Sequence, residues 1–331
     1  MTITNLKIGF IGAGSIGSLF GGFLADIKSE NYSVQVIFFC KKFHADKVNK
    51  KGLVLISNQK RKVIKTIKAY ENEKIFEKDS TNGFDFLFLT TKAYDSEEAV
   101  RQYKRLIDKS KWVVILQNGI GNEDIIIPYC EKSKIIRIVT SAGAFSDKPG
   151  RVLHTGEGMT KIGFPFLNEL NLEEQIKEKA RSDINTLKDL LNLAGLETII
   201  AEDIISECWE KVLVNIGINA LGALTRLPNG KILEVEGLKY IMEEAINEAV
   251  MVAKLKKIKL SKRDYVSIAH NVAQKTAMNK NSMLQDILNK KPTEIEYMNG
   301  KILKYAGELG IKVPFNESLT LLIRGLERSK I

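Results

Sequence analysis

The sequence has few cysteines, and those present form no pattern. Its 331 residues include three, Cys40, Cys130 and Cys208, which are far apart and odd in number. This excludes a disulfide framework and offers no metal-ligand spacing, so we expect three reduced thiols and no metal site. Proline is also scarce, at 6 residues, and no segment has the composition of a long disordered region.

Long hydrophobic runs are absent as well. No apolar stretch approaches the roughly 20 residues that a membrane-spanning helix needs. The short run Ile8–Ile11 ends in glycines and therefore lacks the form of a signal peptide. These features predict a cytoplasmic protein with no membrane segment.

Acidic residues are in deficit, 40 against 50 basic ones, which gives a net charge of +10. The basic residues are interleaved with acidic ones, and no basic module with interleaved aromatics is present, which argues against nucleic-acid binding. An anionic small-molecule cofactor and substrate would benefit from a field of this sign. Solvated lysine-rich faces account for most of the excess.

The length and the change of pattern along the chain indicate two domains. A chain of 331 residues is too long for one ordinary domain, and 44% hydrophobic residues can supply two cores. Strands alternate with helices until Pro165, and long amphipathic helices dominate afterwards. We predict an α/β Rossmann-type doubly wound domain over residues 1–168, closed by a hairpin of edge strands at 150–163, and an all-α helical domain over residues 169–331.

A glycine-rich turn follows the first predicted strand. The segment Gly12-Ala13-Gly14-Ser15-Ile16-Gly17 separates a short apolar run from a helical pattern. In this context the first glycine allows a tight turn, the second lets a pyrophosphate approach the backbone, and the third lets the helix pack on the strand. The N–H groups of the new helix would then face the phosphates. The alternative is a glycine-rich turn without a ligand.

An acidic residue is missing where an NAD-binding domain would have one. The second predicted strand, residues 33–39, ends in Cys40, Lys41 and Lys42. An acid at this point would hold the ribose hydroxyls of NAD, whereas a lysine suits the 2′-phosphate of NADP. We therefore infer NADP, with Lys41 as the phosphate partner; the alternative is a solvated basic pair.

Two further polar residues follow later strands of the same sheet. Lys92 comes after the apolar run at residues 84–90, and Asn118 after the run at 112–116. Ligands of such sheets bind beyond the carboxyl ends of the strands, so both are placed to meet the cofactor. The Asn118–Gly119 pair also fits an ordinary turn.

The helical half contains a polar stripe. Lys211, Asn215 and Asn219 are spaced i, i+4, i+8 in a segment that is otherwise apolar nearly all round. Buried amides and a buried lysine are costly unless paired, so we expect the stripe to line a cleft. There the lysine would be a general acid, and the amides would hold the hydroxyl and carboxylate groups of a small substrate. The alternative is a solvated helix face.

Downstream, three more polar residues are candidates for the same site. Asn229 stands in a Leu-Pro-Asn-Gly turn, and Ser282 is either a helix cap or a loop hydroxyl. Thr293 and Glu296 fit a capping box, with Glu294 in the first turn of the following helix. Spacing alone leaves Glu294 either idle there or part of the site.

Taken together, these segments resemble ketopantoate reductase (2-dehydropantoate 2-reductase) over nearly the whole chain. The resemblance is carried by seven motifs: Gly12-x-Gly14-x-x-Gly17, Thr91-Lys92-Ala93, Asn118-Gly119-Ile120-Gly121, Lys211-Val-Leu-Val-Asn215-x-x-x-Asn219, Pro228-Asn229-Gly230, Ser282-Met-Leu-Gln-Asp286 and Thr293-Glu294-Ile-Glu-Tyr-Met-Asn299-Gly300. It implies a Rossmann domain followed by a helical domain, with the active site in the cleft between them.

The resemblance also implies NADPH-dependent reduction of ketopantoate to pantoate, on the route to pantothenate and coenzyme A. Lys211 matches the catalytic lysine. The substrate-binding positions are matched by Lys211, Asn215, Asn219, Asn229 and Ser282, and the cofactor contacts by Gly12–Gly17, Lys41, Lys92, Asn118 and Glu294. The family often has Arg where this chain has Lys41, and Lys lacks the planar fork that grips a phosphate.

Two other functions stay open from the sequence. One is an NADPH-dependent reductase of another branched 2-oxo acid. The other is a non-catalytic NADP-sensing protein on the same fold, against which the presence of Lys211 with both asparagines argues. The expected partner is a small-molecule 2-oxo acid, and the amphipathic helices of the second half are compatible with a homodimer.

Overall fold

The computed structural model describes residues 3–79 and 83–329, which divide into two compact units. The first unit takes the chain up to Gln117 and residues 122–204, and the second takes residues 118–121 and 205 onward. The division therefore falls later than the expected boundary at 168/169. The reason is that α7 (Glu174–Leu193) packs on the sheet of the first unit and β12 (Thr198–Ile200) pairs with its strand β11 (Thr160–Gly163).

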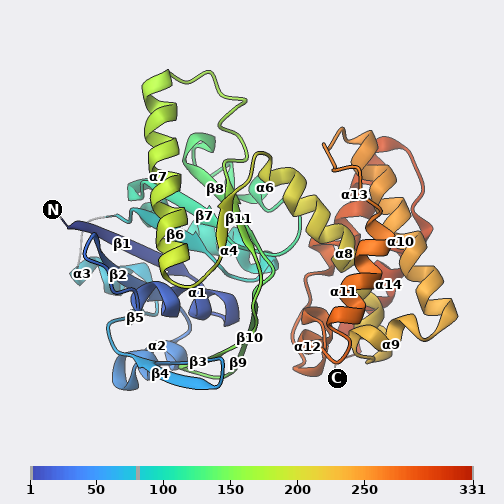
Figure 1. Cartoon of the computed structure of the whole chain (residues 1–331), viewed down its shortest axis with the longest axis horizontal. Coiled ribbons are helices and arrows are strands. Elements are labelled where there is room, and N and C mark those ends of the chain that lie inside the picture. The colour runs from blue at the N-terminus through green and yellow to red at the C-terminus, as the bar shows by residue number, and fades with distance from the viewer. Residues whose placement is uncertain (1–2, 80–82, 330–331) are drawn as a thin grey trace. The chain divides into compact units, whose positions relative to one another are not determined.

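The main sheet of the first unit has eight strands in the order β12-β11-β8-β7-β6-β1-β2-β5 (Figure 1). Its neighbours pair in parallel except where β11 runs antiparallel to β8. The chain reverses direction across the sheet between β1 and β6, the point at which doubly wound folds bind their ligands. The remaining bounds are β1 (Thr4–Ile11), β2 (Tyr32–Phe39), β5 (Lys68–Tyr70), β6 (Phe86–Leu89), β7 (Trp112–Ile115) and β8 (Ile135–Thr140).

Both faces of this sheet are covered, which explains its nearly continuous apolar strands. Phe10 of β1 packs on one face, where it stacks on Phe88 with ring centroids 4.6 Å apart, and Ile11 packs on the other. The first face is covered by α1 (Ser15–Ala25) and α7. The second face is covered by α3 (Glu73–Asp79), α4 (Ser96–Gln102), α5 (Lys104–Lys109) and α6 (Glu123–Ile126). The predicted doubly wound domain is confirmed.

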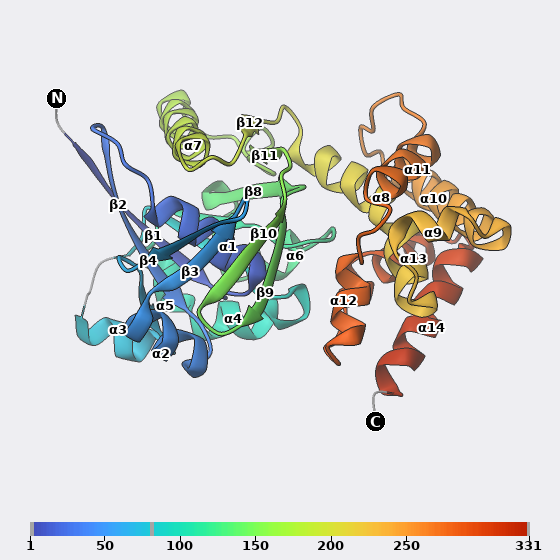
Figure 2. The same ribbon diagram turned by 60° about the horizontal axis from the view of Figure 1, so that its bottom comes forward.

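A smaller sheet packs against α1, with the order β4-β3-β10-β9 (Figure 2). Its strands are β3 (Leu53–Ser57), β4 (Lys60–Ile64), β9 (Gly143–Lys148) and β10 (Arg151–Gly156). The predicted hairpin at 150–163 is wrong, because β10 pairs with β9 and β3 whereas β11 joins the main sheet. The tight turn comes one strand earlier, at Gly150, whose φ of +75° suits glycine.

Every regular element of the second unit within residues 205–329 is helical. Its helices are α8 (Ile204–Thr225), α9 (Asn229–Leu233), α10 (Glu236–Leu255), α11 (Tyr265–Lys275), α12 (Ser282–Leu288), α13 (Asn299–Leu309) and α14 (Pro314–Arg328), with the 3₁₀ turn η3 (Ile295–Tyr297) before α13. Across residues 3–79 and 83–329, no helix has the length and apolar character to cross a membrane.

A buried polar network holds four of these helices together. Glu248 of α10 accepts hydrogen bonds from the backbone N–H groups of Phe315 and Asn316, each at 2.9 Å, at the start of α14. Asn299 of α13 donates to Asn316 Oδ1 at 3.1 Å and to the Ile216 carbonyl of α8 at 3.4 Å. The carboxylate thus satisfies N–H groups that the first turn of a helix leaves without partners.

The glycine-rich turn has the geometry that its sequence predicts. Gly12 has a φ of +92°, and its N–H donates to the Phe39 carbonyl at 2.8 Å. A Cβ on Gly17 would lie 2.3 Å from the Gly12 carbonyl oxygen, so α1 packs this closely only with glycine there. A Cβ on Gly14 would meet no protein atom within 4 Å, which leaves open space at the start of α1.

His44 of α2 (Lys42–Lys51) links this turn to the smaller sheet. Its Nδ1 accepts a hydrogen bond from Gly150 N at 3.3 Å, and its Nε2 lies 3.4 Å from Ser18 Oγ. Ser18 Oγ donates in turn to the Ala13 carbonyl at 2.9 Å, inside the glycine motif. This arrangement uses the neutral imidazole, and burial lowers the pKa of His44.

Alanine substitutions at Gly14 and Gly17 should have different effects: one should mainly weaken NADPH binding, and the other should mainly lower the stability of the fold. Gly17→Ala should destabilise the protein by about 1–3 kcal/mol, because its methyl group overlaps the backbone. Gly14→Ala should lower the melting temperature only slightly, because Gly14 is the N-cap of α1 and alanine caps less well. It should weaken NADPH binding about tenfold or more, because its methyl group occupies the space that the pyrophosphate would enter. Thermal melts and NADPH titrations measure both. A Gly14→Ala variant that binds NADPH normally would contradict this account.

The buried histidine predicts a pH dependence of stability. The folded pKa of His44 lies below its ordinary value of 6.5, so the unfolded chain binds the proton first as the pH falls. The free energy of unfolding should therefore decrease from about pH 6.5 down to the folded pKa. His44→Asn keeps an acceptor for Gly150 N but does not titrate, so it should lose less stability than the parent between about pH 7.5 and about pH 5.5. Urea unfolding measures the difference, and identical pH profiles would refute the assignment.

Candidate active site

In the first unit, the predicted cofactor residues gather at the carboxyl ends of three adjacent strands. Gly12 follows β1, Lys41 follows β2 as the residue before α2, and Lys92 follows β6 as the residue before the 3₁₀ turn η1 (Ala93–Asp95). Burial raises the pKa of the Asp95 carboxyl; the positive charges of Lys41 and Lys92 act against that rise, and the negative charge of Glu98 adds to it. The two lysines therefore act on one region, at the point where the sheet changes direction.

This edge fits a dinucleotide. Gly14, which precedes α1, leaves space where a Cβ would project, and the first turn of α1 contains no acidic residue to repel a phosphate. Lys41 is exposed at the end of β2, with no carboxylate in its place to select a bare ribose. The donor set is thus suited to an anionic nucleotide cofactor with an additional phosphate.

Gln117, which the sequence analysis did not single out, holds the turn that carries Lys92. Its side chain is 6% exposed, and its Nε2 lies 2.8 Å from the Thr91 carbonyl and 2.7 Å from Ser96 Oγ. The backbone carbonyl of Gln117 accepts from Arg137 at 2.7 Å, and Arg137 is paired with buried Glu123 at 2.7 Å. These partners lie far apart in sequence, so no local pattern could have revealed them.

In the second unit, three of the predicted residues form one hydrogen-bonded chain. Lys211 Nζ of α8 donates to Asn118 Oδ1 at 2.8 Å, and Asn118 Nδ2 lies 3.4 Å from Glu294 Oε2. Glu294 is only 4% exposed. A single amide therefore joins an ammonium group to a buried carboxylate, and this defines the orientation of the Asn118 side chain.

The segment that carries Asn118 docks on the helical unit through its backbone. Ile120 N donates to the Tyr297 carbonyl of η3 at 3.0 Å. Gly119 has a φ of +92°, and a Cβ there would lie 2.5 Å from the same carbonyl oxygen. The Asn-Gly pair is therefore more than a surface turn, because it places Asn118 beside Lys211.

The polar stripe lies on one helix, as its spacing predicts. Lys211 and Asn215 are half-buried, and Asn219 is 4% exposed with its Nδ2 3.5 Å from Met298 Sδ. The stripe is therefore not a solvated face. Met298 directly precedes α13, so its thioether forms part of the surroundings of Asn219.

Asn281, to which the sequence analysis gave no role, directly precedes Ser282 and contacts the side chain of Asn229. Asn229 is buried, and its Nδ2 donates to Thr276 Oγ1 at 2.9 Å. Ser282 is the first residue of α12 and is exposed, while Asn281 is the N-cap, whose Oδ1 accepts from Leu284 N at 2.9 Å. An asparagine before a helical pattern is a capping signal, so the sequence did contain this information.

The capping box expected at Thr293 and Glu296 is wrong. Thr293 Oγ1 accepts from Ile295 N at 3.3 Å, but Glu296 forms a two-point ion pair with Arg324 of α14, at 2.6 and 2.8 Å. The segment is a 3₁₀ turn rather than the first turn of an α-helix. Glu294 directly precedes that turn and points its carboxylate to Asn118.

None of the three cysteines, all of which lie in the part of the chain that the structure describes, is in a disulfide. Burial raises the pKa of Cys40 to about 12 and that of Cys130 to about 11, so both stay protonated at neutral pH. This agrees with the expectation of reduced thiols.

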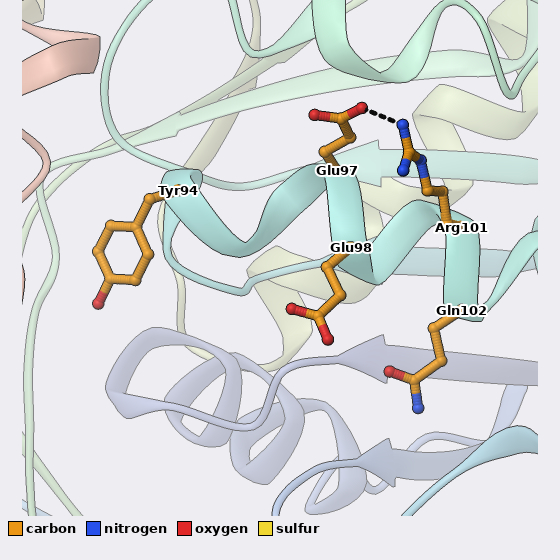
Figure 3. Close-up of a pocket in the computed structure, with 5 residues that line it drawn as sticks. All are labelled: Tyr94, Glu97, Glu98, Arg101 and Gln102. Carbon is orange, nitrogen blue, oxygen red and sulfur yellow. Dashed lines mark hydrogen bonds and ion pairs between the residues drawn. The ribbon is translucent and has the colours of Figure 1, made fainter.

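A surface pocket on the first unit begins two residues after Lys92, and one of its lining residues, Glu98, acts on Asp95 together with Lys41 and Lys92. It is lined by Tyr94, Glu97, Glu98, Arg101 and Gln102 along η1 and α4, and Glu97 is ion-paired with Arg101 at 2.5 Å (Figure 3). Both partners of this pair are largely exposed, at 61% and 65% of the side chain. Exposed pairs of this kind contribute little to stability or binding, so we assign no chemistry to the pocket.

The chain matches known proteins over both units. The profile described as "Ketopantoate reductase PanE/ApbA" matches residues 8–165, and "Ketopantoate reductase PanE/ApbA C terminal" matches residues 203–327. A 2-dehydropantoate 2-reductase of Pyrococcus abyssi is 36% identical over 324 residues, which covers 97% of this chain and 98% of the relative.

Solved structures agree with this relationship. A ternary structure of D-mandelate dehydrogenase with NADH and anilino(oxo)acetate is 27% identical, with a TM-score of 0.85, and the match covers 98% of this chain and 99% of that one. A PanE/ApbA family ketopantoate reductase of Ralstonia eutropha is 26% identical, with a TM-score of 0.81 and the same coverage. The chain therefore belongs to the ketopantoate reductase PanE/ApbA family.

Proposed function

We propose that this protein reduces 2-dehydropantoate (ketopantoate) to (R)-pantoate with NADPH, in pantothenate and coenzyme A biosynthesis. The observation that carries the proposal is the hydrogen-bonded chain Lys211–Asn118–Glu294, with spacings of 2.8 and 3.4 Å. It occurs in a chain whose relatives are named for this activity. A general acid must be held within hydrogen-bond reach of the atom it protonates, and the contact with Asn118 holds the Lys211 ammonium group in one position.

Lys211 is the general acid in this proposal. When bound, NADPH supplies a hydride to the keto carbon, and the electron pair of the carbonyl bond moves to its oxygen. Lys211 donates its proton to that oxygen, which yields the hydroxyl group of pantoate. Asn118 orients the ammonium through its Oδ1, and it links Lys211 to the buried negative charge of Glu294.

The asparagines and the serine bind the substrate. Ketopantoate carries a carboxylate, a keto group and a terminal hydroxyl, which need several hydrogen-bonding partners. Asn215 and Asn219 follow Lys211 at successive turns of α8 and would bind the polar groups next to the reacting carbon. Asn229 and Ser282 begin helices α9 and α12 and would bind the other end of the molecule.

We assign the cofactor as NADPH because lysines, and no acidic residue, follow the second strand of the main sheet. Gly12, Ala13, Gly14, Ser15, Ile16 and Gly17 would hold the pyrophosphate, and Lys41 the 2′-phosphate. Lys92, Asn118 and Glu294 would bind the remainder of the cofactor. The exposed position of Lys41 at the end of β2 supports a preference for the additional phosphate, because this is the strand end where that phosphate would lie.

Replacing the lysine tests the proposed chemistry. Lys211→Ala should lower kcat for ketopantoate about 10²- to 10⁴-fold and leave the Kd of NADPH unchanged, because the proton donor is lost. Lys231→Ala, an exposed lysine paired with Glu234 in the same unit, is the matched control and should keep full activity. Loss of NADPH binding in Lys211→Ala would contradict the role of the lysine as an acid.

A second candidate is a reductase of an aromatic 2-oxo acid. It is favoured by the similarity to D-mandelate dehydrogenase, whose structure holds NADH. The corresponding substrate here would be phenylglyoxylate, which lacks the terminal hydroxyl of ketopantoate.

The two candidates differ in substrate preference. A site built to hydrogen-bond a hydroxyl discriminates strongly against an analogue without it. We therefore expect kcat/KM for ketopantoate to exceed that for phenylglyoxylate by at least about a hundredfold. Steady-state NADPH oxidation with each acid measures this ratio, and a ratio below one would replace the first candidate by the second.

We further propose that the protein is cytoplasmic and forms a homodimer. Its partner would be a small-molecule 2-oxo acid, and it would not bind nucleic acid. Exposed apolar side chains on α10 and α14 support pairing through the helical unit: Leu255 is 48% exposed, Leu321 53% and Leu322 56%. The interleaving of acidic with basic residues supports a small anionic ligand rather than a nucleic acid.

A further inference from the structure

One buried side chain, Asn281, connects the three segments that carry Asn219, Asn229 and Ser282. It is 8% exposed and caps α12 through its Oδ1, which accepts from Leu284 N at 2.9 Å. Its Nδ2 lies 3.3 Å from the Ile218 carbonyl of α8 and 3.4 Å from Asn229 Oδ1 of α9. Both amide hydrogens and the amide oxygen are thereby directed to the protein.

These contacts control the orientation of Asn229. Its Oδ1 accepts from Asn281, so its Nδ2 is left to donate to Thr276 Oγ1, at 2.9 Å. Rotating the Asn229 amide by half a turn would set two N–H donors against each other. Asn281 therefore fixes the orientation of the Asn229 amide, with Oδ1 toward Asn281 and Nδ2 toward Thr276. It also caps the helix that starts with Ser282.

We infer that Asn281 is a positioning residue for the substrate site: it aligns Asn229 and the start of α12 without contacting the substrate. The inference rests on the proposed function, which assigns Asn229 and Ser282 to the substrate. The tight surroundings of Asn281 support it. A Cβ on Gly222 of α8 would lie 2.1 Å from Asn281 Nδ2, so glycine at that position leaves room for the amide.

Asn281→Ser separates the positioning role from the capping role. Serine keeps an oxygen that caps α12, and it removes the amide that reaches Ile218 and Asn229. We expect the KM for the 2-oxo acid to rise about tenfold and the Kd of NADPH to stay unchanged, with a lower melting temperature because the Ile218 carbonyl and Asn229 Oδ1 lose a buried donor. Asn289→Ser, the same substitution at the exposed other end of α12, is the matched control and should leave KM unchanged.

Gly222→Ala perturbs the same amide from another helix. Its methyl group would push Asn281 Nδ2 aside, so this variant should raise KM in the parent enzyme as Asn281→Ser does. In the Asn281→Ser background the clash is gone, and adding Gly222→Ala should change KM little further. Additive effects of the two substitutions would overturn the inference, because they would show that Gly222 acts independently of Asn281.

A readout independent of turnover keeps this test separate from that of the proposed function. The side-chain amide signals of Asn229, observed by NMR with ¹⁵N-labelled asparagine and assigned with Asn229→Asp, should move in Asn281→Ser and in Gly222→Ala but not in Asn289→Ser. If the parent enzyme reduces no 2-oxo acid, the proposed function fails, and these signals still decide the position of Asn229. Unchanged Asn229 signals in both variants would overturn the inference.

Discussion

The hydrogen bond between Lys211 and Asn118 is the contact on which the candidate site depends. It places an ammonium group on α8, a helix whose other side chains are largely apolar and buried. A charge in such surroundings is costly unless polar groups meet it, and here an amide and a buried carboxylate do so in series. Two other features of the second unit hold the elements that carry these residues: Tyr297 of η3 binds the backbone of Ile120, and the Glu248–Asn316–Asn299 network links α8 to α10, α13 and α14.

The first unit meets a different constraint, which is close approach of backbone to ligand. At Gly12 and Gly17 a Cβ would overlap neighbouring protein atoms, so the fold itself requires glycine there. At Gly14 a Cβ would meet no protein atom, so the space beside it is open to a ligand. The same edge of the sheet brings Lys41 and Lys92 to the ends of the two strands that flank β1, beside the glycine turn. This is why the general binding site of a doubly wound sheet is readable from strand order alone.

The fold class and most elements were predictable because they depend on local patterns. The glycine turn, the apolar strands and the i, i+4, i+8 stripe of α8 are properties of short segments, and all appear in the structure. The predictions failed where partners far apart in sequence compete. β10 pairs with β3 rather than with its neighbour β11, α7 packs on the first unit, and Glu296 binds Arg324 rather than capping a helix. The contacts of Gln117, and those of Asn281 beyond its local capping of α12, were missed for the same reason, since these partners lie up to 26 and 63 residues away.

The most direct test of the account follows the hydride itself. The unmodified protein would be incubated with ketopantoate and NADPH carrying deuterium in the transferable position at C4, and the product analysed by mass spectrometry, with deuterated NADH in parallel. The account predicts pantoate that carries one deuterium at C2 and forms much faster with NADPH than with NADH. Bound NADPH with no deuterated pantoate would contradict it.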